Sequence, residues 1–218
     1  MKGTFEARRG EEVTAREEWA VERGPAGAAL RARGSLTGKR DTTWTLDALT
    51  DTKGAVASFE MQLSLKPPPT EVTTVAMRSF GPRAFVTRIP PGGVPERLET
   101  DLGPGSVVVG PSIALMGLCA GALDLKAGMG RRVVLLTLSS EELEARLEDG
   151  LVLYPRRSRG PGPGGAQGWV RRFEVKRAVN VGVPDAVLLL DDRSSAVVRA
   201  ELNAGPRPSV AALTDFSA

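Results

Sequence analysis

The sequence predicts a mainly β protein, in which an antiparallel curved sheet or half-barrel wraps around one buried apolar helix. Apolar and polar residues alternate with a period of two along much of the chain, which is typical of strands with one buried face. The 25 glycines and 16 prolines are scattered, and scattered turn formers separate many short strands. One uncharged segment, 103–123, interrupts the alternation and is the candidate helix.

The first half of the chain reads as a meander of antiparallel strands. Near the N-terminus, Trp19 and Val21 share an apolar face on which Glu17 intrudes. The clearest strand is 55–65, whose apolar face carries Ala57, Phe59, Met61, Leu63 and Leu65. Further strands are expected at 28–36, 44–48, 71–80, 84–89 and 94–102. A spacing of about ten residues between turns is typical of an antiparallel meander.

The uncharged segment divides into a buried strand at 106–109 and a short helix at 111–123. Pro111 suits the first helical position, where no amide donor is needed. The helix is apolar on nearly every side and is therefore expected to be buried. The whole segment is long enough for a bilayer span, but prolines and glycines interrupt it and no Lys/Arg cluster flanks it. Membrane insertion is therefore not expected.

The second half contains strands at 132–138, 151–157 and 169–181, followed by a hairpin of 186–190 with 196–202. Between the first two, Ser139-Ser140-Glu141-Glu142 resembles a capping box and favours a second short helix to Asp149, although a strand through Leu143, Ala145 and Leu147 fits nearly as well. The Gly/Pro-rich segment 158–168 predicts a mobile surface loop. Residues 1–204 read as a single β-rich domain and residues 205–218 as an irregular C-terminal extension.

The composition argues against enzymatic activity. The chain of 218 residues has no histidine and one cysteine, Cys119, which removes the usual general base and the usual zinc ligand. The pair Asp191-Asp192 lies at a predicted hairpin turn, where aspartate serves local hydrogen bonds. No Walker or Ser-x-x-Lys motif occurs. We therefore predict no catalytic residue, no metal and no cofactor.

The large apolar side chains define the candidate binding site. They are expected on the concave side of the sheet: Trp19, Trp44, Phe59, Met61, Phe80, Phe85 and Trp169. If the helix fills the concavity, these residues are core. If it fills the concavity incompletely, a cavity remains for an apolar or amphipathic, lipid-like ligand. The leading hypothesis is a non-catalytic binding protein for such a ligand.

Two alternatives stay open. The first is a structural or interaction protein with a filled core, which forms a homodimer through a sheet edge. The second is a nucleic-acid-associated protein that uses Arg156, Arg157, Arg159, Arg171, Arg172 and Arg177. A net charge of only +3 and few nearby aromatic residues argue against nucleic acid. The N-terminal residues lack the apolar core of a secretory signal, which predicts a cytoplasmic location.

The order of elements also resembles a known group. A long meander, an apolar helix entered through Val109-Gly110-Pro111 and then further strands are similar to the lipoprotein-carrier-like half-barrels of bacteria and to uncharacterised bacterial domains related to them. The stretch 169–202, with Gly182-Val183-Pro184, resembles their closing strands. The resemblance implies a curved sheet wrapped on a helix and affinity for lipid-like molecules. It rests on pattern and transfers no individual functional residue.

Overall fold

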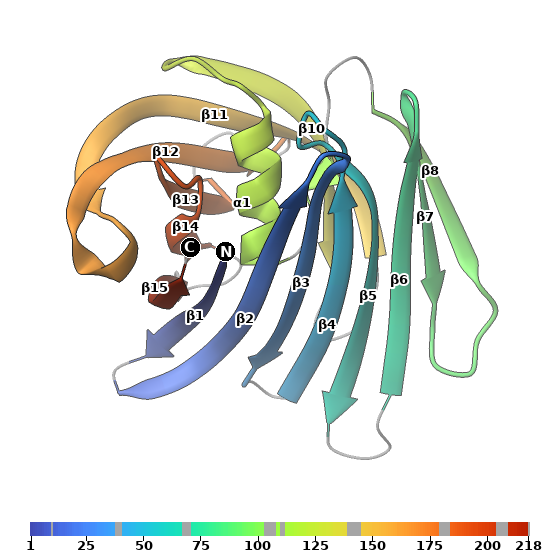
Figure 1. The fold of residues 1–218 in the computed structure, drawn as a ribbon. Helices are drawn as coiled ribbons and strands as arrows, with labels where there is room; N and C mark the ends of the chain where they lie inside the picture. Colours follow the sequence, from blue (N-terminus) through green and yellow to red (C-terminus); the bar gives the residue numbers. More distant parts are fainter. Residues whose placement is uncertain are drawn as a thin grey trace.

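The computed structural model describes residues 1–9, 11–37, 41–66, 71–102, 108–109, 112–138, 145–178, 184–203 and 209–217. The strands in these ranges form one sheet of 15 strands in the order β8-β7-β6-β5-β4-β3-β2-β1-β15-β14-β13-β12-β11-β10-β9. The sheet curls into a nearly closed, barrel-like shape with a helix inside the curve (Figure 1). The predicted fold class is therefore confirmed.

The first half of the chain forms one arm of the sheet. Its strands are β1 (Lys2–Arg9), β2 (Glu12–Gly24), β3 (Gly27–Leu36), β4 (Asp41–Thr50), β5 (Val56–Lys66), β6 (Glu71–Phe80), β7 (Arg83–Ile89) and β8 (Glu96–Asp101). Each pairs antiparallel with the next. The alternation that predicted them is also their burial pattern: Phe59, Met61, Leu63 and Leu65 of β5 all point into the core.

The second half crosses the interior and builds the other arm. Its elements are β9 (Val108–Val109), α1 (Ile113–Ala122), β10 (Met129–Leu138), β11 (Ala145–Pro161), the 3-10 helix η1 (Pro163–Gly165), β12 (Gln167–Arg177), β13 (Ala186–Asp191), β14 (Val197–Leu202) and β15 (Ser209–Ser217). β9 pairs parallel with β10, and the other pairs are antiparallel. β1 pairs with β15, so the two ends of the chain meet in the middle of the sheet (Figure 1).

Helix α1 is the centre of the core, as its apolar sequence predicted. Leu115 and Cys119 are fully buried in it, and Leu188 and Leu190 of β13 are fully buried on the surrounding sheet. Among the described residues, no helix has the length and apolarity that crossing a bilayer requires.

The second helix predicted at 139–149 is wrong where it can be judged. Residues 139–144 lie outside the described residues, and β11 begins at Ala145. Leu147 pairs with Leu136 of β10, and Ala145 pairs with Leu138. The alternative prediction, a strand through this segment, is correct for the described residues. β10 lies beside the segment as a pairing partner, and such tertiary pairing overrides a local helix-capping signal.

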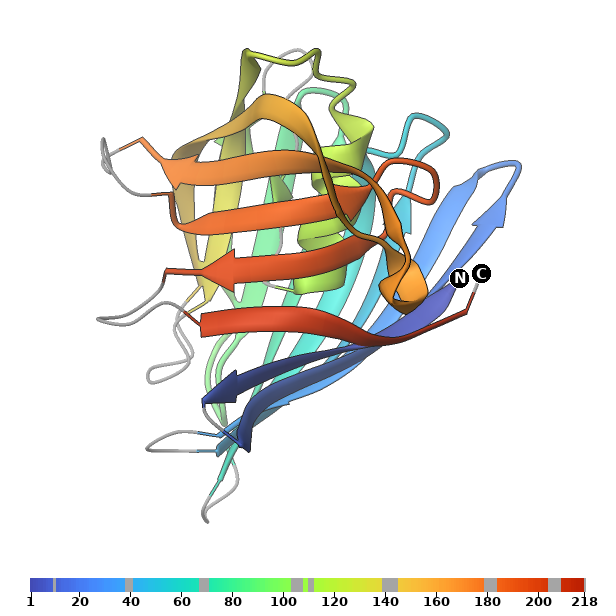
Figure 2. The ribbon, with the colours of Figure 1, turned by 90° about the vertical axis from the view of Figure 1, so that its left-hand side faces the viewer.

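The mobile loop predicted at 158–168 is also wrong. β11 continues to Pro161 and pairs with β12, with Arg159 opposite Trp169, and η1 closes the hairpin next to β15. The hairpin bends across β13, β14 and β15 (Figure 2). It packs because Gly160 brings the backbone close to Val170: a Cβ at Gly160 would lie 2.9 Å from that side chain.

The prediction of an irregular tail at 205–218 is wrong for the residues that the structure describes there. Residues 209–217 form β15, which pairs with β1 on one side and β14 on the other. The pairing absorbs a register shift between Thr4 and Phe5, and Ala211 is buried in the core. The sheet therefore extends past residue 204, the predicted end of the domain.

Candidate ligand-binding site

Helix α1 is anchored at its N-terminus by the carboxylate that intrudes on the apolar face of β2. Glu17 accepts hydrogen bonds from the Ser112 hydroxyl at 2.5 Å, the Ile113 amide at 3.0 Å and the Ala114 amide at 3.3 Å. The Ser112 hydroxyl in turn accepts from the Leu115 amide at 3.1 Å. Glu17 is 3% exposed. The first amides of a helix have no partner within the helix, and here β2 supplies one from across the core.

Burial raises the pKa of Glu17 above its ordinary value, and the hydrogen bonds from Ser112, Ile113 and Ala114 oppose that rise only in part. The folded protein therefore binds the Glu17 proton more tightly than the unfolded chain does. The protonated Glu17 carboxyl therefore contributes to the free energy of unfolding. This contribution is fully present below about pH 4.5, the ordinary pKa of a glutamate, and is lost as the pH rises through the pKa that Glu17 has in the folded protein.

We expect the wild-type free energy of unfolding, measured relative to Glu17→Gln, to fall as the pH rises above about 4.5 and then to level off. Glutamine does not titrate, so this difference isolates the carboxyl. Urea unfolding of both proteins at a series of pH values measures it. A difference that stays constant or grows with pH would contradict the direction of the pKa shift.

Small residues on α1 set how closely the helix approaches the sheet. A Cβ at Gly117 would lie 2.2 Å from Cγ2 of Val197 on β14, so the helix backbone packs directly on the Val197 side chain with no room for a side chain at Gly117. Next to this contact, a void of only about 20 Å³ remains among Phe5, Trp19, Ala114 and their neighbours. That volume holds about one water molecule, so this part of the concavity is filled by the helix.

One turn of α1 farther on, the helix is not fully covered. A cavity of about 310 Å³ opens between the C-terminal half of α1 and the turns β2–β3, β4–β5 and β13–β14. We call it the mouth cavity. Its apolar wall is formed by the buried Gly117 and the half-buried Leu118, Gly121 and Ala122, and its rim carries Arg23, Asp51, Lys53 and Ser195. These turns lie at the same end of the barrel as the tip of the β11–β12 hairpin, at the right in Figure 2.

The rim turns are ordered by their own side chains. Asp51 accepts hydrogen bonds from the Lys53 and Ala55 amides at 2.8 and 2.9 Å. Asp191 accepts from the Arg193 and Ser194 amides at 3.2 and 2.8 Å. Asp191 therefore has the local role in its hairpin turn that the sequence predicted. Hydrogen bonds within the chain therefore fix the shape of both turns beside the mouth cavity.

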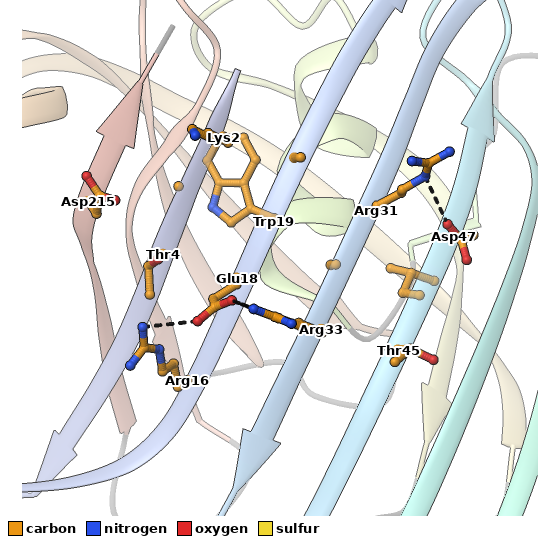
Figure 3. Close-up of a pocket in the computed structure, with 14 residues that line it drawn as sticks. Lys2, Thr4, Arg16, Glu18, Trp19, Arg31, Arg33, Thr45, Asp47 and Asp215 are labelled. Atoms are coloured by element: carbon orange, nitrogen blue, oxygen red, sulfur yellow. Dashed lines mark hydrogen bonds and ion pairs between the residues drawn. The ribbon is translucent and has the colours of Figure 1, made fainter.

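A second hollow, of about 580 Å³, lies on the outer face of β1 to β4 and β15 (Figure 3). Its long side chains are already joined in ion pairs. Glu18 lies between Arg16 and Arg33 at 3.0 and 2.5 Å, and Arg31 is 3.6 Å from Asp47. These pairs hold the pKa of Glu18 below its ordinary value, the Arg33 hydrogen bond having the largest effect. This open surface encloses a ligand less than the mouth cavity does and is therefore the weaker candidate for a binding site.

The structure separates the seven predicted lining residues into two groups. Trp19, Phe59 and Met61 are buried in the core, and Trp44 is half-buried against it. Three are exposed, contrary to the prediction that they face an enclosed concavity: Phe80 is 63% exposed, Phe85 38% and Trp169 44%. Phe80 and Phe85 contact each other edge to face at the β6–β7 hairpin, because Ala84 and Val86 take the inward positions of β7.

Sequence reasoning missed the residues of the mouth cavity. The strands that Gly117 and Gly121 of α1 meet are not encoded in the sequence near the helix. The turns that complete the cavity lie about 70 to 100 residues away along the chain on both sides. The available signal was the run of small residues in α1, which includes Gly117, Gly121 and Ala122, since small residues leave a helix face narrow.

Strand pairing brings together five of the six predicted arginines, whereas Arg177 lies at the other end of β12, opposite Gly150. Arg156 lies opposite Arg172, and Arg157 lies opposite Arg171. Acidic residues offset much of this charge: Asp192 is 2.5 Å from Arg157, Glu174 is 3.0 Å from Arg172 and Asp185 is 2.9 Å from Arg177. The result is a mixed-charge surface on which Arg159, stacked over Trp169 at 4.7 Å, stands out.

No protein-family model matches this sequence, and no curated protein matches it. Solved structures do. A beta-barrel-like protein of the domain of unknown function DUF1849 from Brucella abortus is 13% identical, with a TM-score of 0.60 over 98% of this chain and 94% of that chain. A DUF1089 family protein from Pseudomonas aeruginosa is 14% identical, with a TM-score of 0.53 over 84% and 87%.

At this level of identity the likeness concerns the fold. This chain is similar in architecture to uncharacterised, barrel-like bacterial proteins, as the sequence indicated. The descriptions of these two proteins name no catalytic activity. The resemblance to lipoprotein carriers stays a prediction.

Proposed function

We propose that this protein is a non-catalytic binding protein for an amphipathic, lipid-like ligand, and that the ligand binds in the mouth cavity. The observation that carries the proposal is the uncovered face of α1 inside a cavity of about 310 Å³. This volume is at the lower end of the range typical of small-molecule sites. The site differs from the one the sequence suggested: it lies at one end of the barrel rather than along the whole concavity.

The two sides of the mouth cavity fit the two parts of an amphipathic molecule. The helix side presents Gly117, Leu118, Gly121 and Ala122, which offer apolar contact and no side-chain hydrogen bond. The rim carries the cations Arg23 and Lys53 and the hydroxyl of Ser195. A short apolar chain against α1 would bury apolar area at about 25 cal/mol per Å², while its polar end stays at the rim and in contact with water.

The decisive variant is Gly121→Leu, which fills the mouth cavity. A Cβ at Gly121 lies 3.7 Å from Leu190 and 3.8 Å from Ser195, in ordinary contact, so Gly121→Ala is a matched control that adds a single methyl group. We expect dodecanoate and monododecanoylglycerol to raise the melting temperature of the wild type and of Gly121→Ala. We expect neither ligand to raise that of Gly121→Leu, because binding to the folded state alone stabilises it.

A second variant guards against loss of folding in Gly121→Leu. Thr52→Trp narrows the cavity from the exposed β4–β5 turn and leaves the core unchanged, and it should also weaken binding. Native mass spectrometry of the freshly purified wild type should show a bound mass. The proposal fails if no amphipathic ligand binds, or if both filling variants bind as well as the wild type. Elution as an oligomer without ligand binding would favour the interaction-protein alternative.

A further inference from the structure

An exposed tryptophan on the β11–β12 hairpin is covered by two arginines. The guanidinium carbons of Arg157 and Arg159 lie 4.8 and 4.7 Å from the centre of the Trp169 ring. Arg171 follows Trp169 by two residues on β12, and its guanidinium carbon lies 5.7 Å from the centre of the Phe173 ring. We call Arg157, Arg159, Trp169 and Arg171 the arginine–tryptophan cluster. Stacking on an aromatic ring fixes the plane of a guanidinium and leaves its N–H groups free to bind in that plane.

The cluster carries an unbalanced positive charge. Arg157 and Arg171 are direct cross-strand neighbours, and like charges in that position are destabilising. Asp192 offsets them, at 2.5 Å from Arg157 and 3.6 Å from Arg171. Among the described residues, Arg159 has no carboxylate partner. Three arginines against one aspartate leave two positive charges, which match one phosphate dianion.

The cluster is continuous with the mouth cavity. Arg171 donates a hydrogen bond to the Ser195 hydroxyl at 2.7 Å, and Ser195 lines the cavity. Asp192, which holds the arginines, belongs to the same β13–β14 turn as Ser195. In Figure 2 this turn and the β11–β12 hairpin lie at the same end of the barrel. A molecule with its apolar chain on α1 would therefore direct its head group toward the arginines.

We propose that the arginine–tryptophan cluster binds a phosphate group, and that this group is the head of the amphipathic ligand. This inference rests on the proposed function, which it makes more specific. Guanidinium groups bind phosphate oxygens through paired N–H donors. Stacking on Trp169 reduces the side-chain entropy that Arg157 and Arg159 lose on binding. A single phosphate fits better than a polyanion, because Asp192, Glu174 and Asp185 neutralise the neighbouring arginines.

Titration calorimetry with three probes tests this inference. Monododecanoyl lysophosphatidate has both the chain and the phosphate, monododecanoylglycerol has only the chain, and inorganic phosphate has only the head. We expect lysophosphatidate to bind the wild type at least about tenfold more tightly than monododecanoylglycerol, since hydrogen bonds between charged groups are stronger than those between neutral groups. The double variant Arg157→Gln/Arg159→Gln should remove this advantage and leave monododecanoylglycerol binding unchanged.

A matched control is Arg31→Gln/Arg33→Gln on the outer hollow, where two exposed arginines also lie near carboxylates. It should bind lysophosphatidate like the wild type. Equal affinity for the two lipids, or a double variant that keeps the advantage, overturns the inference and leaves the proposed function standing. Binding of phosphate and lysophosphatidate with equal affinity, without binding of monododecanoylglycerol, supports the phosphate site and overturns the proposed function.

An oligonucleotide is the fourth arm of the test. Binding of a single-stranded decamer more tightly than lysophosphatidate, with a steep loss of affinity on added salt, would assign the arginines to nucleic acid and overturn the inference. Weak oligonucleotide binding, unaffected by Arg157→Gln/Arg159→Gln, is the result expected from a site built for one phosphate.

Discussion

Replacing Glu17 with leucine is expected to lower the free energy of unfolding by about 2–4 kcal/mol. The substitution removes the acceptor of three buried hydrogen bonds, from Ser112, Ile113 and Ala114. Leucine fits an apolar core, so the loss arises from the unsatisfied helix amides and the hydroxyl rather than from a cavity. Buried donors without a partner carry their full desolvation cost.

Chemical denaturation of Glu17→Leu measures this loss, with two comparisons. Glu22→Leu on the same strand changes an exposed glutamate and should alter stability by no more than about 0.5 kcal/mol. Glu17→Gln keeps one acceptor oxygen and should lie between the wild type and Glu17→Leu. Wild-type stability in Glu17→Leu would mean that the start of α1 does not depend on β2.

Gly117→Ala is expected to destabilise the protein by about 1–3 kcal/mol, the usual cost of overpacking a core. The added methyl group would lie 2.2 Å from Cγ2 of Val197, so either α1 or β14 has to move. The direction is informative because alanine is intrinsically better than glycine in a helix by about 0.5–1 kcal/mol. Gly121→Ala, four residues along the same helix and free of such a clash, should therefore stabilise the protein.

A double-mutant cycle with Val197→Ala identifies the contact responsible. Removing the Val197 methyl groups makes room for the new one, so Gly117→Ala/Val197→Ala should be more stable than the sum of the single changes predicts. Additive losses would show that Gly117 is needed for another reason. A stabilising Gly117→Ala would contradict the close approach of α1 and β14.

The elements predicted from the sequence are those whose signal is local. β5 alternates over its whole length, and the apolar run that forms α1 has no charge to place on a surface. β15 and the β11–β12 hairpin were misread because their pairing partners decide their conformation. Ser209–Ser217 becomes a strand because β1 and β14 each lie beside it, and no pattern within the tail shows that both are available.

The candidate site shows the same limit. Glu17 was visible as a charge on an apolar face, but its partner Ser112 is 95 residues away, so the alternation indicated an unusual charge without showing what it binds. Trp169 was predicted on the concave side of the sheet with the other large apolar residues, yet it is 44% exposed. Which of the predicted aromatic residues are core and which are exposed is therefore decided by contacts between distant segments, which no local pattern records.

The most direct test of the central claim, that an amphipathic ligand binds in the mouth cavity, is paramagnetic broadening of backbone amide signals by a fatty acid with a nitroxide near the end of its chain. The account predicts selective loss of the Gly117, Leu118 and Gly121 signals, with weaker broadening at Ser195, and recovery of these signals on competition with unlabelled dodecanoate. Broadening centred on Phe80 and Phe85, or on the outer hollow around Glu18, would contradict it, as would spectra unchanged by the labelled lipid.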